Sequence, residues 1–183
     1  LGTYGESRVI TRKDVSAETI LASDAVLIGL NKTRRLYNRR IRELKKLPQQ
    51  VVAGDRLVCL KNKRDAGLLN GGLWDVSAVT KRKAGEIHLE VDPFDAGTSR
   101  RIAAVKVHPY FFEDREAELS WQDLKGFDQF TYGYALTVHK FQGSQADRVT
   151  LFDESHSFRD SRRAHLYTGI TRAAEQIDVV VPT

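Results

Sequence analysis

The sequence has 183 residues, of which 41% are hydrophobic and 9% aromatic, so it can form one ordinary domain or two small ones and is not a disordered chain. Its net charge of +5 and isoelectric point of about 9.4 are compatible with a polyanionic partner. No apolar run approaches the roughly 20 residues of a membrane helix, and no secretory signal opens the chain. We therefore expect a cytoplasmic protein with no membrane partner.

The N-terminal segment carries helix and strand patterns. Leu1–Glu6 is loop-like and opens without a cap, which we interpret as the start of a fragment of a longer protein. Thr11–Leu21 predicts a short helix, capped by Thr11 or Ser16. Ala25–Leu30 is a short apolar run, typical of a strand buried on both faces of a parallel sheet.

A basic helix is predicted next, over Asn31–Leu47, with Asn31 or Thr33 as its cap. Its apolar stripe consists of residues spaced at i, i+4 and i+7, namely Tyr37, Ile41 and Leu44. The remaining surface is mostly lysine and arginine. It is either a solvated face or a helix whose first turn, with Asn31 and Arg35, approaches a phosphate.

Four short strands follow, and their spacing predicts a small barrel: Arg56–Leu60, Trp74–Thr80, Glu86–Val91 and Ile102–His108. Glycine and aspartate separate them, as in the turn at 95–97. The single cysteine, Cys59, lies in an apolar run and is interpreted as a core residue. One cysteine excludes both an intrachain disulfide framework and a thiolate metal cluster.

After an acidic and aromatic connector at 111–126, strand and helix patterns alternate again. They predict a strand, a short polar helix-like segment, a second strand, a helix and a last buried strand: Tyr132–Leu136, Thr137–Gln142, Arg148–Phe152, Arg159–Ala174 and Ile177–Val181. The predicted fold class is α/β, with a parallel-sheet domain at 1–48 and 112–183 and a small barrel inserted at 49–111.

Several familiar sites are absent from the sequence. It has no G-x-x-x-x-G-K-[ST] loop to hold nucleotide phosphates, and no spacing of histidines or cysteines that indicates a metal site. What remains is a turn of polar donors where one strand ends, at Thr137–Gln145. In open α/β sheets ligands bind at such positions.

The turn and its neighbour carry a resemblance. TYGYALTVHKFQGSQADRVTLF resembles motif V of superfamily 1 helicases, and LYTGITRAAE resembles motif VI. The residues of these two motifs are similar to those of the RecD-like branch, the exodeoxyribonuclease V alpha type, which acts in DNA repair. The resemblance implies a second RecA-like motor domain, 2A, carrying an SH3-like barrel, 2B.

The resemblance also implies roles for residues. Arg172 would be the arginine finger that reaches the γ-phosphate of ATP, and Gly143 and Gln145 would contact the nucleotide. Many relatives have glutamate where this chain has Gln145. The residues implied for single-stranded DNA are Thr137, His139 and Lys140, with Asn31 and Arg35 as further candidates.

The implied enzyme is an ATP-dependent DNA helicase that moves 5′ to 3′. ATP and Mg²⁺ would be held mainly by an N-terminal motor domain that lies outside this sequence, so this chain alone would be inactive. Single-stranded DNA and that motor domain are the expected partners, and nuclease or recombination subunits are further candidates. Two alternatives stay open: a non-catalytic nucleic-acid-binding or partner-docking module, and an RNA helicase of the same superfamily.

Overall fold

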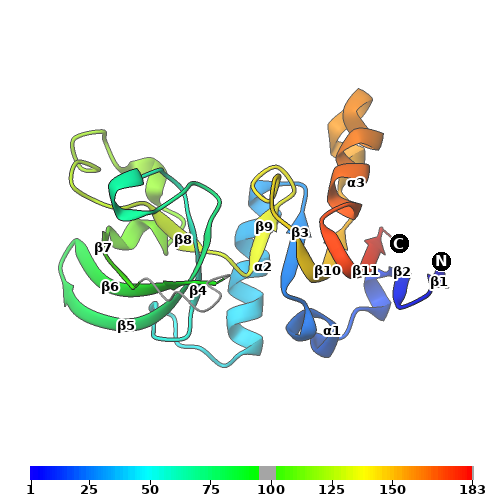
Figure 1. Cartoon of the computed structure of the whole chain (residues 1–183), viewed down its shortest axis with the longest axis horizontal. Coiled ribbons are helices and arrows are strands. Elements are labelled where there is room, and N and C mark those ends of the chain that lie inside the picture. The colour runs from blue at the N-terminus through cyan, green and yellow to red at the C-terminus, as the bar shows by residue number, and fades with distance from the viewer. Residues whose placement is uncertain (95–101, 183) are drawn as a thin grey trace. The chain divides into compact units, whose positions relative to one another are not determined.

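The computed structural model describes residues 1–94 and 102–182. Its chain divides into two compact units, one formed by Leu1–Lys46 with Tyr134–Thr183 and one by Leu47–Gly133. Each unit contains one sheet (Figure 1). The predicted turn at 95–97 lies outside the described residues. In the described part of the chain, no helix is long and apolar enough to cross a membrane.

The first unit is an α/β structure, as predicted. Its six-stranded sheet has the order β1-β2-β11-β10-β3-β9, and every pairing except β1 with β2 is parallel. The strands are β1 Gly2–Tyr4, β2 Ser7–Thr11, β3 Ala25–Ile28, β9 Ala135–Thr137, β10 Ala146–Phe152 and β11 Ala173–Val181. The helices are α1 Ala17–Ala22, α2 Asn31–Leu44 and α3 Arg162–Ile170.

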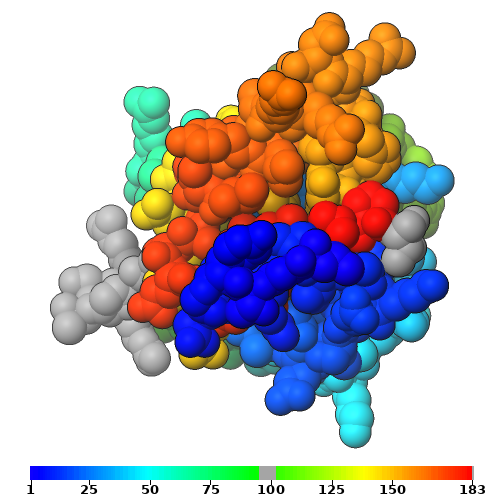
Figure 2. Space-filling view, turned by 90° about the vertical axis from the view of Figure 1, so that its right-hand side faces the viewer, coloured from blue at the N-terminus to red at the C-terminus, as the bar shows by residue number. Residues whose placement is uncertain are grey.

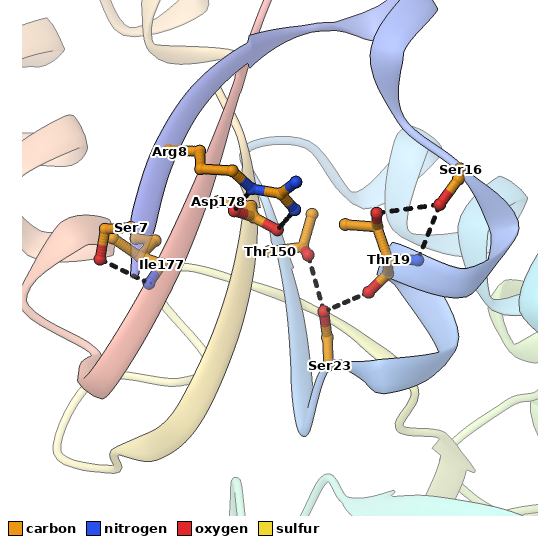
Figure 3. Close-up of polar contacts among 8 residues, drawn as sticks. All are labelled: Ser7, Arg8, Ser16, Thr19, Ser23, Thr150, Ile177 and Asp178. Carbon is orange, nitrogen blue, oxygen red and sulfur yellow. Dashed lines mark hydrogen bonds and ion pairs between the residues drawn. The ribbon is translucent and has the colours of Figure 1, made fainter. Parts of the chain in front are cut away.

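The N-terminal hairpin, β1 and β2, was not predicted, because its strands are short and none of their residues is fully buried. Tertiary contacts hold it in the sheet. Arg8 donates two hydrogen bonds to the Asp178 carboxylate, at 2.8 and 2.6 Å, and the Ile177 N–H donates to Ser7 Oγ at 3.1 Å (Figure 3). The blue N-terminal hairpin and the red C-terminal strand accordingly lie side by side in Figure 2.

Helix α2 covers the β9 edge of this sheet through a buried polar residue. The Asn38 side chain donates to the Ala135 carbonyl at 2.8 Å and accepts from the Ala135 N–H at 2.9 Å. Of the predicted apolar stripe, Ile41 is buried, and the Tyr37 ring lies 4.4 Å from that of Phe152. The predicted cap is wrong: Leu30 is the N-cap of α2 and makes no side-chain capping bond.

The second unit holds a five-stranded antiparallel sheet in the order β7-β6-β5-β4-β8. Its strands are β4 Arg56–Cys59, β5 Leu73–Lys83, β6 Glu86–Pro93, β7 Ala103–Val107 and β8 Phe130–Tyr132. Asp128, just before β8, donates its N–H to the Lys106 carbonyl of β7 at 2.7 Å, which brings the two sheet edges together. Cys59 is a buried core residue, as predicted.

The predicted strand Tyr132–Leu136 is wrong, because the run contributes to two sheets. Tyr132 pairs with Leu57 in the second unit, whereas Leu136 pairs with Leu27 in the first. Between them, a side chain at Gly133 would place its Cβ 2.7 Å from the Leu57 carbonyl carbon. The chain passes from the second unit to the first between Gly133 and Tyr134, and β8 belongs to the second unit.

Candidate functional site

All eight predicted site residues lie in the first unit, but they gather at opposite edges of its sheet. Strands β3, β9, β10 and β11 are parallel, so β3 and β9 end at one edge while β10 and β11 begin at the other. At a rise of about 3.3 Å per residue, a strand of the length of β10 separates the edges by about 20 Å. The site therefore has two halves.

At the carboxyl edge, the segment after β9 is a series of turns rather than the predicted polar helix. Thr137 shapes the first turn: its Oγ1 accepts the Lys140 N–H at 3.3 Å, and its carbonyl accepts the Phe141 N–H at 3.1 Å. Thr137 is buried, whereas His139 is exposed and Lys140 is half-buried. Of these three, His139 offers the most accessible side chain.

Asn31 and Arg35 belong to the same edge. They stand in the first two turns of α2, which follows β3, and β3 pairs with β9 through Ile28 and Thr137. Asn31 is exposed and Arg35 is half-buried. The structure thus brings the five residues predicted for single-stranded DNA to the ends of two neighbouring strands.

At the opposite edge lies Arg172, in the turn between α3 and β11. The predicted helix Arg159–Ala174 is too long at both ends, since α3 ends at Ile170 and β11 begins at Ala173. The half-buried guanidinium is held by neighbouring oxygens. Its nitrogens donate to the Thr168 carbonyl at 3.1 Å, the Ser144 carbonyl at 3.2 Å and the Thr171 hydroxyl at 3.2 Å.

Gly143 and Gln145 flank Ser144, so they lie beside Arg172. Both are exposed, and Gly143 has a φ of +86°. The backbone also joins the two segments, because the Ala146 N–H donates to the Arg172 carbonyl at 3.0 Å. The three residues predicted for the nucleotide therefore form one cluster.

The sequence did not point to Glu154, which the structure places among the carboxyl-edge residues. It is 5% exposed, and its Oε2 accepts the N–H groups of Gly29 and Leu30 at 2.9 and 3.0 Å. Glu154 is the second residue after β10. The rule that polar residues at the ends of parallel strands gather at one edge would therefore have found it.

Phe158, whose ring lies beside Gly29, belongs to a group of three aromatic rings. Phe158 stacks on His165 of α3, with ring centroids 3.9 Å apart, and His139 lies 5.7 Å from each of them. Burial lowers the pKa of His165, and the neighbouring His139 lowers it further. His139 and His165 are 26 positions apart in the sequence, and the fold brings their rings together.

Among the described residues, no group of three or more histidine, cysteine, aspartate or glutamate side chains could hold a metal ion. The site consists of hydrogen-bond donors and aromatic rings. Such groups suit a phosphate, a ribose or a base.

Comparison with known families identifies the segment that contains both halves of the site. Residues 132–180 match the family described as the UvrD-like helicase C-terminal domain. The matched residues include every predicted site residue except Asn31 and Arg35, which lie earlier in the chain.

Curated relatives agree with the RecD-like resemblance of the chain. The RecBCD enzyme subunit RecD of Mycolicibacterium smegmatis is 47% identical over 47 residues, which are 26% of this chain and 8% of that protein. RecD of Mycobacterium tuberculosis is 45% identical over the same length, with the same coverage. The aligned region is therefore a small part of these relatives.

Solved helicase structures share the fold. Pif1 helicase from Candida albicans matches with a TM-score of 0.56 at 16% identity, over 85% of this chain and 44% of that one. Pif1 from a Bacteroides species, in complex with ADP-AlF4, has a TM-score of 0.50 over 95% of this chain and 45% of its own. At this identity the likeness shows the fold alone.

Proposed function

We propose that the chain is the C-terminal motor portion of an ATP-dependent, RecD-like DNA helicase. In this proposal the first unit is motor domain 2A and the second is an inserted SH3-like barrel, 2B. The observation that carries it is the cluster of Arg172, Gly143 and Gln145 inside a UvrD-like helicase domain, at the sheet edge opposite the basic and aromatic residues.

The donors at the Arg172 edge fit one side of a nucleotide. The guanidinium can donate to phosphate oxygens, and the exposed Gln145 amide can bond to a ribose hydroxyl. The sequence lacks a phosphate-binding loop, so ATP and Mg²⁺ need a second motor domain that supplies one. When bound, ATP supplies the phosphoryl group whose transfer releases free energy.

Hydrogen bonds to neighbouring residues hold the Arg172 side chain in place. The carbonyls of Thr168 and Ser144 hold its guanidinium, and exchanging these neutral acceptors for charged phosphate oxygens would favour a nucleotide-facing position. An arginine that stabilises the charge of a transferring phosphoryl group accounts for a rate factor of about 10³–10⁵.

The opposite edge would contact the nucleic acid. Lys140 and Arg35 carry positive charge, and His139 and Asn31 expose polar side chains beside them. Contacts of this kind are mainly to the phosphate backbone, which suits a protein that moves along a strand without reading its sequence. Movement in the 5′ to 3′ direction is part of the proposal.

The test is Arg172→Ala in the full-length protein. We expect ATP turnover to fall by at least about 10³-fold, while the Kd for single-stranded DNA changes by less than about twofold. Arg163→Ala, which removes an exposed arginine of α3, is the matched control and should retain turnover. Near-normal turnover in Arg172→Ala would exclude the arginine-finger role.

A second candidate is a non-catalytic nucleic-acid-binding or docking module, and the missing phosphate-binding loop favours it. A G-x-x-x-x-G-K-[ST] motif in the preceding sequence supports the motor, and its absence there supports the module. An RNA helicase is distinguished by measuring unwinding of DNA and RNA duplexes side by side.

A further inference from the structure

The carboxylate of Glu154 occupies a position that is built for it. It is the second residue after β10, is 5% exposed, and accepts two backbone N–H groups at the point where β3 turns into α2. A buried carboxylate is unfavourable unless hydrogen bonds satisfy it. These two N–H donors, next to the positive end of the α2 dipole, stabilise its charge.

Gly29 leaves the space that this arrangement needs. A Cβ at Gly29 would lie 2.8 Å from the Glu154 Cβ and 3.0 Å from Cε2 of Phe158. Any side chain there would push the carboxylate or the ring away from the start of α2. Glu154, Gly29 and Phe158 therefore form one packed contact.

The ring of Phe158 extends this contact to two further elements. It stacks on His165 of α3 and lies 5.7 Å from the ring of His139, in the turn after β9. Glu154 contacts the beginning of α2, and Phe158 contacts both the His139 turn and α3. Through these two residues, the beginning of α2 and the His139 turn are both packed against α3.

We propose that Glu154 is a positioning residue for the nucleic-acid-facing edge, fixing the first turn of α2 beside the His139 turn. The inference rests on the proposed function, since it concerns the same edge. Glu154 itself contacts backbone N–H groups rather than a ligand. Its role is to hold Asn31 in a fixed position relative to His139.

Charge and position predict opposite effects when Glu154 is neutralised. If the residue acted only through its negative charge, Glu154→Gln would strengthen attraction for phosphates and tighten binding. If it positions α2, the amide cannot replace both charge-assisted hydrogen bonds, so the edge loosens and binding weakens. The direction of the change separates the two roles.

The experiment measures fluorescence anisotropy of labelled oligo-dT with the full-length protein. We expect the Kd to rise about tenfold in Glu154→Gln. The DNA concentration that half-maximally stimulates ATP turnover should rise equally, with the turnover at saturating DNA within about twofold. Glu18→Gln, which removes the same charge from the exposed first turn of α1, is the control and should not weaken binding.

Phe158→Leu provides a second variant, at a partly exposed position where folding should be preserved. It keeps the carboxylate and removes the stacked ring, and we expect binding about threefold weaker. If Glu154→Gln folds and binds oligo-dT as tightly as the unaltered protein or more tightly, the positioning role is wrong. If Glu154→Gln does not fold, unchanged binding in Phe158→Leu has the same meaning. Either result overturns the inference and leaves the proposed function standing. Failure of the unaltered protein to bind oligo-dT overturns the proposed function as well.

Discussion

Thr137 and His139 are two positions apart, yet Thr137 is buried and His139 is exposed. Thr137 uses its hydroxyl to accept the Lys140 N–H, so it shapes the turn that presents its neighbours. Arg172 is likewise held by oxygens of its own domain. At the scale of single residues, hydrogen bonds within the protein prepare the groups that we propose for ligand contact.

A pH effect is expected at His165. Its pKa lies below the ordinary value, mainly through burial, so the unfolded chain takes up this proton at a higher pH than the folded chain. Neutral His165 therefore makes its full contribution to the free energy of unfolding above about pH 6.5. This contribution is lost as the pH falls below that value and through the lowered pKa of the folded state. Asp153 and Glu154 act in the opposite sense, and His139 acts in the same sense as burial.

Urea unfolding at about pH 7.5 and pH 5.5 measures this effect. We expect the free energy of unfolding of the unaltered chain to fall from about pH 7.5 to about pH 5.5. The fall should be smaller in His165→Leu. His156→Gln, at an exposed histidine, should behave as the unaltered chain does. An equal loss of stability in His165→Leu would contradict the assignment to His165.

At the scale of elements, chain direction decides which residues meet. Parallel strands bring the ends of β3, β9 and β10 to one edge, which is where Glu154 joins the start of α2. The break between β8 and β9 sends two halves of one β-prone run into different sheets. Neither effect follows from the composition of a single element.

Gly133→Ala tests that break. Its Cβ would lie within 3 Å of three backbone atoms of Leu57 and Val58, which cannot move as a flexible side chain can. We expect the free energy of unfolding to fall by about 1–3 kcal/mol. Gly2→Ala is the control, since the atoms nearest to its Cβ would belong to the Tyr4 side chain, at 3.4 Å. If urea unfolding gave the same free energy for Gly133→Ala and the unaltered chain, the prediction would be wrong. The backbone would then have moved to make room for the Cβ.

At the scale of the whole molecule, two units with separate sheets carry a net charge of +5. The proposed site residues lie in the first unit only, so the function of the second unit is a separate question. Unit 2 is continuous in sequence and unit 1 is not, which is the arrangement expected of an insertion.

Salt dependence is the matching prediction for the 183-residue chain. With about three phosphate contacts to a single strand, log K should fall with log salt at a slope near −2, or more than about tenfold between roughly 50 and 200 mM. Titration of labelled oligo-dT at several salt concentrations measures this slope. Nanomolar binding that does not respond to salt would contradict a phosphate-based interface.

A second prediction for the 183-residue chain is that it shows no ATP turnover without a second motor domain. The outcome that tests the salt dependence is separate.

The amino-acid sequence alone was enough to predict the α/β class, the strands at Ala25–Leu30 and Arg148–Phe152 and the helicase resemblance, because these rest on local hydrophobic patterns and contiguous motifs. Three features became visible in the folded chain: Gly133 ends one unit, Arg172 lies in a turn rather than a helix, and Glu154 accepts a hydrogen bond from Gly29. Each of these depends on contacts between segments far apart in the chain. Local propensity does not encode such contacts, since they exist only once the sheet has assembled.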